Sequence, residues 1–339
     1  MTPPRCRLLG AVIVCPVVMT ALGLPTGQTT GVLDETVVSD WCERSLGAGV
    51  AYVLFRSGYL SQVIGAQLTD GRPVVVKVRP FEPRIAGCVA VQARLAATGF
   101  PCPLPLAGPV TVGGFAITAE TYMPGGEHLP REYGAAPSAG LLARLVASAP
   151  GVSVVPSLAP SPPWAGWDHP GARLWPDRDD EGGDLNQSPG PDWVDRAAGQ
   201  VRRLLSTCRD LLRVGHGDWE SQNMRWAGER VVAVHDWDSV IAQPEVAIAG
   251  LASAVWPVGR EYGQAATVEQ SADFITCYQA AAGARWTGPQ VQQAWAAGLW
   301  VLLSDAKKEA VKNGGGPRLG QLVGEIDDRL TLAGLDRDW

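Results

Sequence analysis

The sequence lacks closely spaced cysteines and an excess of positive charge. Its seven cysteines are an odd number, stand far apart and form no Cys-x-x-Cys pair. This spacing argues against a disulfide scaffold and against a structural zinc site, and it predicts reduced, mostly buried thiols. The formal net charge is −6. We therefore expect no general electrostatic attraction to nucleic acid or to an anionic membrane.

The sequence also lacks internal repeats. Its composition is that of a globular protein. Hydrophobic residues make up 46% of the chain and charged residues 18%, which indicates a folded rather than a disordered chain. A length of 339 residues is enough for one large domain or two smaller ones, each with its own core.

The N-terminal third predicts a small lobe that contains both strands and helices. The pair Asp70-Gly71 stands between two β-rich runs, which is typical of a hairpin. The second run, Pro73–Val78, is apolar except for Lys77. The other elements expected here are a helix at Thr36–Leu46 that Ser39 or Asp40 would cap if it starts late, a helix at Ala86–Thr98, the extended stretch FPCPLPL and a strand at Gly114–Glu120.

From Ser138 onward the sequence predicts mainly helices. They are expected at Asp192–Leu212, Glu245–Trp256, Val268–Gly283, Pro289–Lys312 and Arg318–Leu332. The exception is a stretch at 157–191, rich in Pro, Gly and Trp, which predicts a long loop or insertion. It carries an acidic cluster of Asp177, Asp179, Asp180, Glu181 and Asp184.

Residues 215–239, GHGDWESQNMRWAGERVVAVHDWDS, hold the strongest candidates for chemistry. The run MRW, the turn AGER and the buried run VVAV predict a short hairpin that brings Asn223 and Asp236 to the same edge of a sheet. Asp218 lies five residues before Asn223, on the loop that leads into the hairpin. Two oxygen ligands and a further carboxylate suit Mg²⁺, a hard cation that keeps waters and also contacts phosphate.

The spacing from His216 through Asp218 to Asn223, followed by a strand that ends in Asp236, resembles the aminoglycoside phosphotransferase family. That family shares the protein-kinase-like fold with choline and homoserine kinases. The resemblance runs from about Leu33 to Leu332. It implies a two-lobed α+β fold, with a β-rich N-lobe and a larger, mainly helical C-lobe, that transfers the γ-phosphoryl of ATP to a hydroxyl of a small molecule.

The resemblance also implies a role for each of these residues. Asp218 would accept the proton of the acceptor hydroxyl, Asn223 and Asp236 would hold Mg²⁺ on the nucleotide, and His216 would brace the loop. Lys77 would contact the α- and β-phosphates of ATP. A lone lysine inside VVVKV is costly unless its ammonium is paired, which supports a polar partner for it.

Two further segments are candidate nucleotide contacts. The turn RSGYLSQV lies where the family has its phosphate-covering loop, so Ser57, Gly58 and Ser61 would offer amides or hydroxyls to phosphate. The segment ETYMPGG lies where the family connects its lobes, and Glu120 and Tyr122 would bind adenine through their backbone groups. A plain hairpin turn and an ordinary linker are the open alternatives.

Two positions depart from the family's pattern. The helix after Lys77 reads AGCVAVQARLA and lacks the acid that should pair with this lysine. Either Gln92 replaces it with an uncharged bond, or another acid reaches Lys77. The family also has an Asp after the metal-binding strand that bonds back to the catalytic loop, and here only Glu245 lies nearby.

Two other functions remain open. A metal-dependent phosphohydrolase would use the histidines and aspartates of this stretch. However, His235 and Asp236 would point to opposite faces of a strand, and Lys77 and Asn223 would have no role. A non-catalytic nucleotide-binding or small-molecule-binding protein would explain the missing helix acid, but binding alone does not require a proton acceptor at Asp218.

The N-terminus carries the pattern of a signal peptide or a membrane anchor. Arg5 and Arg7 precede an apolar run from Leu8 to Leu24. A third interpretation is an extension before a true start at Met19. We favour the third, because ATP is available in the cytosol, and we therefore expect a cytoplasmic protein that does not engage a membrane.

We predict an N-terminal extension at 1–30, a nucleotide-binding N-lobe at 31–122, and a catalytic and substrate-binding C-lobe at 123–339 that contains the insertion at 157–191. The cofactors implied are ATP and Mg²⁺, and the partner is a small molecule that bears a hydroxyl. An aminoglycoside-type antibiotic would suit the acidic cluster. Trp164, Trp167 and Trp175 would stack on a flat or sugar-like substrate, unless they belong to the core.

Overall fold

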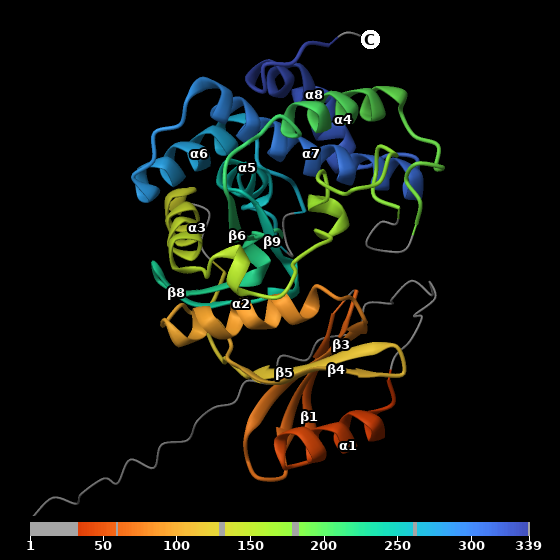
Figure 1. Ribbon diagram of the computed structural model, residues 1–339, viewed down its shortest axis with the longest axis vertical. Helices are drawn as coiled ribbons and strands as arrows, with labels where there is room; N and C mark the ends of the chain where they lie inside the picture. The colour runs from red at the N-terminus through yellow and green to blue at the C-terminus, as the bar shows by residue number, and fades with distance from the viewer. Residues whose placement is uncertain (1–32, 59, 129–132, 178–182, 260–262, 338–339) are drawn as a thin grey trace, which may run out of the picture. The chain divides into compact units, whose positions relative to one another are not determined.

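A five-stranded antiparallel sheet forms most of the N-terminal part of the chain (Figure 1). The computed structural model describes residues 33–58, 60–128, 133–177, 183–259 and 263–337. The strand order is β1-β2-β3-β5-β4. The strands are β1 (Val50–Ser57), β2 (Gln62–Leu68), β3 (Pro73–Pro80), β4 (Pro105–Val112) and β5 (Phe115–Thr121). The predicted hairpin at Asp70-Gly71 joins β2 to β3 and is confirmed.

Helix α1 (Glu35–Leu46) covers one face of this sheet (Figure 1). Val38 and Trp41 of α1 pack against the alternating buried residues of β2 and β3, since side chains of a strand point to opposite faces in turn. Asp34 caps the helix by accepting a hydrogen bond from the Thr36 amide at 2.8 Å. The condition for a cap at Ser39 or Asp40 is not met, because the helix begins at Glu35, before both of them.

Helix α2 (Ile85–Ala97) follows β3 and lies beside the sheet, on the side of the helical part (Figure 1). It matches the helix predicted at Ala86–Thr98. Gly87 allows close packing, since a Cβ at this position would lie 2.6 Å from the carbonyl oxygen of Pro156. The segment after β5 then forms a two-residue bridge, in which the Glu127 amide donates to the Trp226 carbonyl at 2.8 Å.

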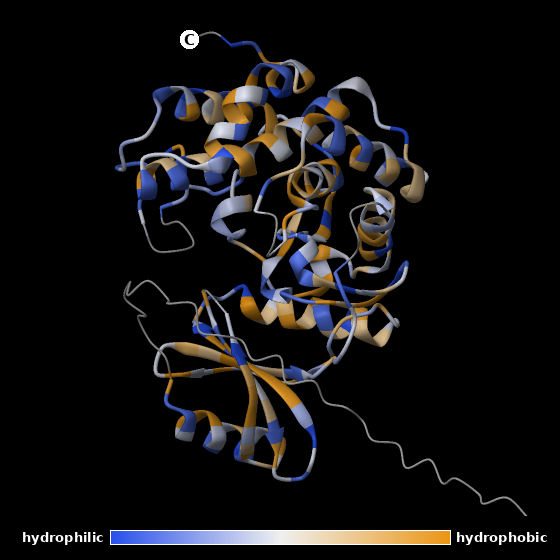
Figure 2. Ribbon diagram, turned by 180° about the vertical axis from the view of Figure 1, so that it is seen from behind, coloured by the Kyte–Doolittle hydropathy of each residue, from blue (hydrophilic) through white to orange (hydrophobic). Residues whose placement is uncertain are grey.

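The C-terminal part of the chain is mainly helical, as predicted. Its helices are α3 (Ala136–Ser148), α4 (Asp192–Leu205), α5 (Glu245–Val255), α6 (Val268–Ala282), α7 (Gly288–Asn313) and α8 (Pro317–Leu332). Two strand pairs lie among them: β6 (Leu212–His216) with β9 (Val240–Pro244), and β7 (Met224–Ala227) with β8 (Arg230–Val234). Most of these helices carry both apolar and polar residues (Figure 2), as expected for helices with one buried face.

One predicted helix was too long. The helix expected at Asp192–Leu212 ends at Leu205, and Leu212 is instead the first residue of β6. Leu212 pairs with Pro244, which lies 32 positions later in the chain. This long-range pairing is invisible to a local hydrophobic pattern, which counted Leu211 and Leu212 as helical.

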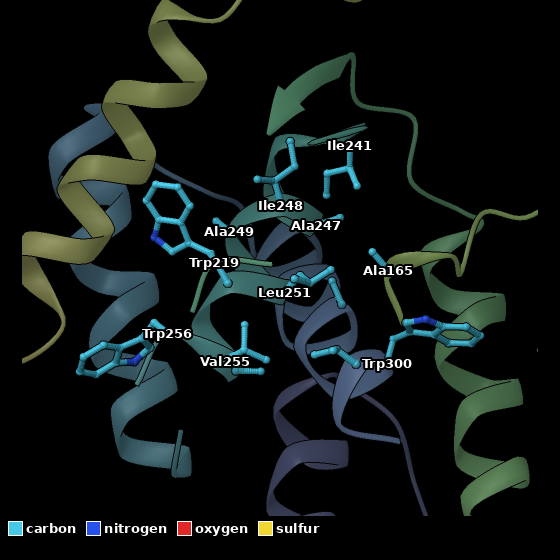
Figure 3. Close-up of a cluster of buried hydrophobic side chains, with 14 of the residues drawn as sticks. Ala165, Trp219, Ile241, Ala247, Ile248, Ala249, Leu251, Val255, Trp256 and Trp300 are labelled. Carbon is cyan, nitrogen blue, oxygen red and sulfur yellow. The ribbon is translucent and has the colours of Figure 1, made fainter. Parts of the chain in front are cut away.

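The centre of the C-terminal core is the crossing of α5 and α7. Every residue of α5 after Glu245 is buried. Figure 3 shows Leu251 and Val255 of α5 and Trp300 of α7 within one cluster of buried hydrophobic side chains. At the crossing, a Cβ on Gly250 would lie 2.0 Å from the carbonyl oxygen of Ala294. Only glycine lets the two backbones approach this closely.

We therefore expect Gly250→Ala to destabilise the protein. The added methyl must push α7 away, and overpacking of this kind lowers the free energy of unfolding by about 1–3 kcal/mol. Urea unfolding followed by circular dichroism measures this. Gly324→Ala is the matched control: no atom lies within 4 Å of its Cβ position, on the exposed side of α8. It should raise stability by about 0.5–1 kcal/mol through helix propensity. Equal effects of the two changes would contradict the close crossing.

No helix in the described ranges is both long and apolar enough to cross a membrane. The apolar run Leu8–Leu24, the alternative start Met19 and the basic residues before them lie outside the described residues.

Candidate functional site

The loop that carries Asp218 is positioned by the pairing of β6 with β9. His216 ends β6 and pairs with Val240, the first residue of β9. Because the strands are antiparallel, the loop after β6 and the turn before β9 lie at the same end of the pair. The amide of Gly217 donates to the carbonyl of Ser239 at 2.6 Å. This places residues 217–223 beside residues 235–239.

The predicted hairpin, β7 with β8, brings the other two candidates to this point. Asn223 directly precedes β7, and its carbonyl accepts a hydrogen bond from the His235 amide at 2.8 Å. The Asn223 side-chain amide donates to Asp218 Oδ2 at 2.8 Å and to the Asp218 carbonyl at 3.1 Å. The carboxyl group of Asp236 lies close enough to Asp218 for its charge to raise the pKa of Asp218. The three residues thus form one cluster.

Trp219 holds this loop in the core. Its indole is fully buried and donates to the Ser138 carbonyl at 3.2 Å and to the Ser138 hydroxyl at 3.1 Å. Figure 3 shows the indole beside Ile248 and Ala249 of α5. Asp218 directly precedes Trp219, so burial of the indole fixes the backbone from which the Asp218 carboxylate projects.

Asp236 has an unusual backbone conformation. Its φ is 63°, the left-handed region, and within the described residues it is the one non-glycine residue with positive φ. An L-residue in this region costs roughly 1–2 kcal/mol, although Asp and Asn tolerate it better than most. The strand β8 ends at Val234, so His235 and Asp236 are not on a strand. The argument that they point to opposite faces of a strand was therefore wrong.

The carboxylates here are crowded and buried. Burial, then the charges of Glu220 and Asp236, raises the pKa of Asp218 well above its usual value. Burial, followed by the Asp238 charge, raises the pKa of Asp236 to about 7. Burial raises the pKa of Glu220 to about 7, and the nearby Arg318 opposes this. A cation bound among these buried carboxyl groups would stabilise their charged forms.

The donor set fits Mg²⁺. The side-chain nitrogen of Asn223 faces Asp218. The side-chain oxygen of Asn223 is therefore available as a metal ligand, and Asp236 offers a carboxylate as a second one. Mg²⁺ is commonly bound through one or two carboxylates, with waters and substrate phosphates completing its shell. In the ranges that the structure describes, no three His, Cys, Asp or Glu side chains form a ready-made metal site.

Both ring nitrogens of His216 contact backbone groups. It is fully buried, its Nε2 lies 3.1 Å from the His235 carbonyl, and its Nδ1 accepts from the Asp218 amide at 3.2 Å. This arrangement places the ring proton on Nε2. Burial lowers the pKa of His216 to about 4, so the ring is neutral at pH 7. The geometry agrees with a bracing residue and leaves no ring nitrogen free for a metal.

Lys77 lies in the middle of β3 and is buried. Its Nζ is 3.3 Å from Glu120 Oε1, and Gln92 of α2 donates to the other oxygen, Oε2, at 2.9 Å. Burial alone would lower the pKa of Lys77, but Glu120, then Asp238 and Asp236, outweigh it and the pKa is raised. The ammonium thus stays charged. Both open alternatives for its partner are combined, because another acid pairs with Lys77 and Gln92 orients that acid.

Sequence reasoning missed this side-chain role of Glu120. It predicted only backbone contacts of Glu120 with adenine, and these stay a prediction. The available signal was the register of two strands: Lys77 pairs with Thr118, and Glu120 lies two residues further on the same face. That signal requires knowing that β3 and β5 are neighbours. Glu245, the acid that follows the predicted metal-binding strand, accepts a hydrogen bond from the Tyr278 hydroxyl at 3.0 Å.

The remaining candidate nucleotide contacts lie around the β1–β2 turn and the end of β5. Ser57 ends β1, and Gly58 has φ 106°, with its Cβ position only 1.9 Å from the Ser61 carbonyl oxygen. Only glycine fits this turn. The rings of Tyr122 and Phe55 lie 5.9 Å apart. These positions suit the predicted nucleotide contacts and suit a simple turn and linker equally well.

The insertion at 157–191 contacts the loop that carries Asp218. The Trp164 indole donates to the Gly217 carbonyl at 2.8 Å, one residue before Asp218. Arg202 of α4 anchors the insertion by donating to backbone carbonyls of Trp167, His169, Gly171, Arg173 and Leu174. A guanidinium has enough donors to bind a curved backbone in this way. The insertion therefore supports the loop, and is more than a surface connection.

The described parts of this insertion give little support to substrate stacking or to a free acidic patch. Trp167 and Trp175 are buried, at 8% and 1% exposure, so they belong to the core. Asp177 and Asp184 both pair with Arg173, at 2.8 and 2.7 Å. The other acids of the predicted cluster, Asp179, Asp180 and Glu181, lie outside the described residues.

No protein-family model matches the chain, and no curated protein matches its sequence. Solved structures do match its fold. An amicoumacin kinase, solved with AMP-PNP, Ca²⁺ and Ami, matches with a TM-score of 0.62 at 13% identity, over 90% of this chain and 96% of that one. A spectinomycin phosphotransferase with ADP and spectinomycin matches with a TM-score of 0.53 at 11% identity, over 90% and 94%.

A putative aminoglycoside phosphotransferase from Ralstonia eutropha gives a similar result, with a TM-score of 0.53 at 15% identity, over 88% of this chain and 97% of that one. Identities this low speak for the fold alone. The chain therefore has the two-lobed, protein-kinase-like fold of aminoglycoside phosphotransferases and related small-molecule kinases. The resemblance predicted from residues 216–236 and the predicted fold class are confirmed at this level.

Proposed function

We propose that this protein is an ATP-dependent phosphotransferase that moves the γ-phosphoryl group of ATP to a hydroxyl of a small molecule. The observation that carries the proposal is the cluster of Asp218, Asn223 and Asp236, within electrostatic reach of the buried Lys77–Glu120 pair. A cation-binding pair, a proton acceptor and a fixed ammonium are the parts that phosphoryl transfer requires. Neighbours in fold were solved with AMP-PNP or ADP.

Each residue has a role that follows from its contacts. Asp218 orients the acceptor hydroxyl and takes its proton at a carboxylate oxygen, while Asn223 fixes the orientation of that carboxylate. Asn223, through its amide oxygen, and Asp236 hold the cation. Lys77, held by Glu120, steadies the phosphates of the nucleotide. Bound Mg²⁺ and ATP would supply charge neutralisation and the group to be transferred. Positioning and electrostatics carry the reaction, with no covalent enzyme intermediate.

Two alternatives lose their main support. The binding-protein alternative arose because α2 has no acid to pair with Lys77. Glu120 of β5 forms this pair with Lys77. The phosphohydrolase alternative required histidine ligands, but both ring nitrogens of His216 bond to the backbone. Neither alternative explains why Asn223 is directed at Asp218.

The acceptor belongs to this proposal as a class: a small molecule with a hydroxyl and amine groups, such as an aminoglycoside-type antibiotic. The support is the fold, whose solved neighbours include kinases of amicoumacin and spectinomycin, and a formal net charge of −6. Ser57, Gly58, Ser61 and Tyr122 are proposed as the remaining nucleotide contacts. A cytoplasmic location is part of the same proposal, because ATP is available there.

The proposal is tested by measuring ADP formation from Mg²⁺ and ATP with a panel of acceptors: aminoglycosides, spectinomycin, choline, homoserine, sugars and macrolides. We expect one acceptor class to raise the rate far above the acceptor-free rate, and mass spectrometry to show one added phosphoryl group. Removal of the divalent cation with EDTA should abolish the transfer.

Different outcomes point to different alternatives. Tight ATP binding without transfer to any acceptor would favour the binding protein. Release of phosphate from phosphoesters in the absence of ATP would favour the phosphohydrolase. A protein begun at Met19 serves for these assays beside the full chain, and equal activity of the two would show that residues 1–18 do not take part.

A further inference from the structure

Two arginines of the N-lobe reach the turn that carries Asp236, which we define as residues 235–240. Arg79 is on β3, two residues after Lys77, so both side chains project from the same face of the sheet. Arg79 Nη1 pairs with Asp238 Oδ2, and the Arg79 side chain is only 10% exposed. Asp238 lies two residues after Asp236, in the short helical turn Trp237–Ser239 that Asp236 precedes, and the two carboxyl groups are close enough for their charges to interact.

Arg84 holds the same turn by its backbone. This residue precedes α2 and is 4% exposed. Its Nη1 donates to the Asp238 carbonyl and its Nη2 to the Val240 carbonyl. The thiol of Cys88, one turn into α2, also lies 3.7 Å from the Asp238 carbonyl. Arg84 thus binds whatever side chain stands at 238, whereas Arg79 depends on its carboxylate.

The turn needs such support because Asp236 is strained. A left-handed non-glycine residue persists only where the surrounding structure over-determines it. From the catalytic loop, His216 bonds to the His235 carbonyl and the Gly217 amide donates to the Ser239 carbonyl. Within the turn, the Ser239 hydroxyl donates to Asp236 Oδ2 at 3.1 Å. The two arginines supply the contacts from the opposite side.

We propose that Arg79 is a positioning residue that acts through the carboxylate of Asp238 to hold Asp236 in the orientation needed for cation binding. The inference rests on the proposed function, and adds a residue to which the motif at 216–236 gives no role. It links the strand of the phosphate-binding lysine to the cation-binding turn. The chain therefore has a charged connection between these two parts, although α2 carries no acid to provide one.

The test separates cation binding from nucleotide binding. Mn²⁺ is used as the probe, and its binding in the presence of ADP is measured by electron paramagnetic resonance. ADP binding without metal is measured by calorimetry in EDTA. For Arg79→Gln we expect Mn²⁺–ADP affinity to fall about 10–100-fold, the usual effect of removing a residue that supports a metal ligand. Metal-free ADP affinity should stay the same, because Lys77 and Glu120 are untouched.

Three further variants sharpen the result. Asp238→Asn should lower Mn²⁺–ADP affinity as Arg79→Gln does, and the double variant should be no weaker than the worse single one, because both remove the same link. Arg79→Lys should recover part of the affinity, since it keeps the charge. Arg72→Gln is the control, because its pair with Asp70 is exposed on the β2–β3 turn, and it should change neither affinity.

Two results would overturn the inference. One is a loss of Mn²⁺–ADP affinity in Asp238→Asn with none in a folded Arg79→Gln, which would mean that Asp238 acts alone. The other is an equal loss of metal-free and Mn²⁺-dependent ADP binding in Arg79→Gln, which would mean a general structural role. Circular dichroism melting establishes that each variant is folded. Failure of the unaltered protein to bind Mn²⁺–ADP would instead overturn the proposed function, and this inference with it.

Discussion

Asp218→Asn should lower kcat by about 10²–10⁴-fold, the usual contribution of a positioned general base. The change replaces one carboxylate oxygen by an amide, so the side chain keeps its shape and still accepts the hydrogen bond from Asn223. It no longer takes the proton of the acceptor hydroxyl. We expect KM for ATP to change little, because Asp218 is assigned to the acceptor and not to the phosphates. Initial rates with the acceptor found in the panel measure both quantities.

A surface aspartate provides the control for this change. Asp210 is exposed and accepts a hydrogen bond from the Gln290 amide at 2.9 Å, eight residues before Asp218. Asp210→Asn should leave kcat and KM unchanged. If Asp218→Asn kept the rate of the unaltered protein, Asp218 would not be the proton acceptor, and the mechanism proposed for the cluster would be wrong. A large rise in KM for ATP would place Asp218 at the nucleotide instead.

Glu120→Gln should be the most destabilising of the changes considered, and should also weaken ATP binding. It leaves the Lys77 ammonium buried beside a neutral amide. Breaking a buried ion pair by removing one partner costs about 3–5 kcal/mol. The lysine is also no longer held toward the phosphates. Urea unfolding measures the loss of stability, and calorimetry with ADP measures the loss of affinity.

A double variant separates the two effects. In Lys77→Met with Glu120→Leu, apolar side chains of similar volume replace the pair, and such replacements are often neutral or stabilising. We expect stability to return and nucleotide affinity to stay low, since the ammonium is gone. Asp327→Asn is the control, because its pair with Arg337 is exposed and worth at most about 1 kcal/mol. Full nucleotide affinity in the double variant would contradict the role of Lys77.

The candidate site illustrates how far local reasoning reaches. The hairpin β7–β8 was predictable from about a dozen residues, because two short apolar runs flank a turn, and it places Asn223 next to the residue that precedes Asp236. Asp218 joins them because β6 pairs with β9, and this pairing spans more than twenty residues. The cluster was predictable in outline because Asn223, at one end of the hairpin, lies five residues after Asp218 in the chain.

Contacts between distant segments were not predictable in this way. The partner of Lys77 depends on β3 and β5 being neighbours, although β4 lies between them in sequence. The pair of Arg79 with Asp238 joins residues that lie 159 positions apart in the chain. Trp164 reaches Gly217 from an insertion whose composition suggested only a loop. Each depends on how distant segments pack, which no local pattern contains.

The sequence by itself determined a small N-terminal part of strands and helices, a mainly helical C-terminal part and the order of the polar residues at 216–236, because hairpin formation and hydrophobic periodicity are local properties. The two-lobed kinase-like fold was implied by the resemblance of that stretch to a known family. Only the tertiary structure decided the partner of Lys77, the left-handed backbone of Asp236 and the end of α4 at Leu205. The physical reason is the same in each case. A buried charge or a strained residue is stabilised by whichever groups the folded chain brings to it, and those groups come from distant segments.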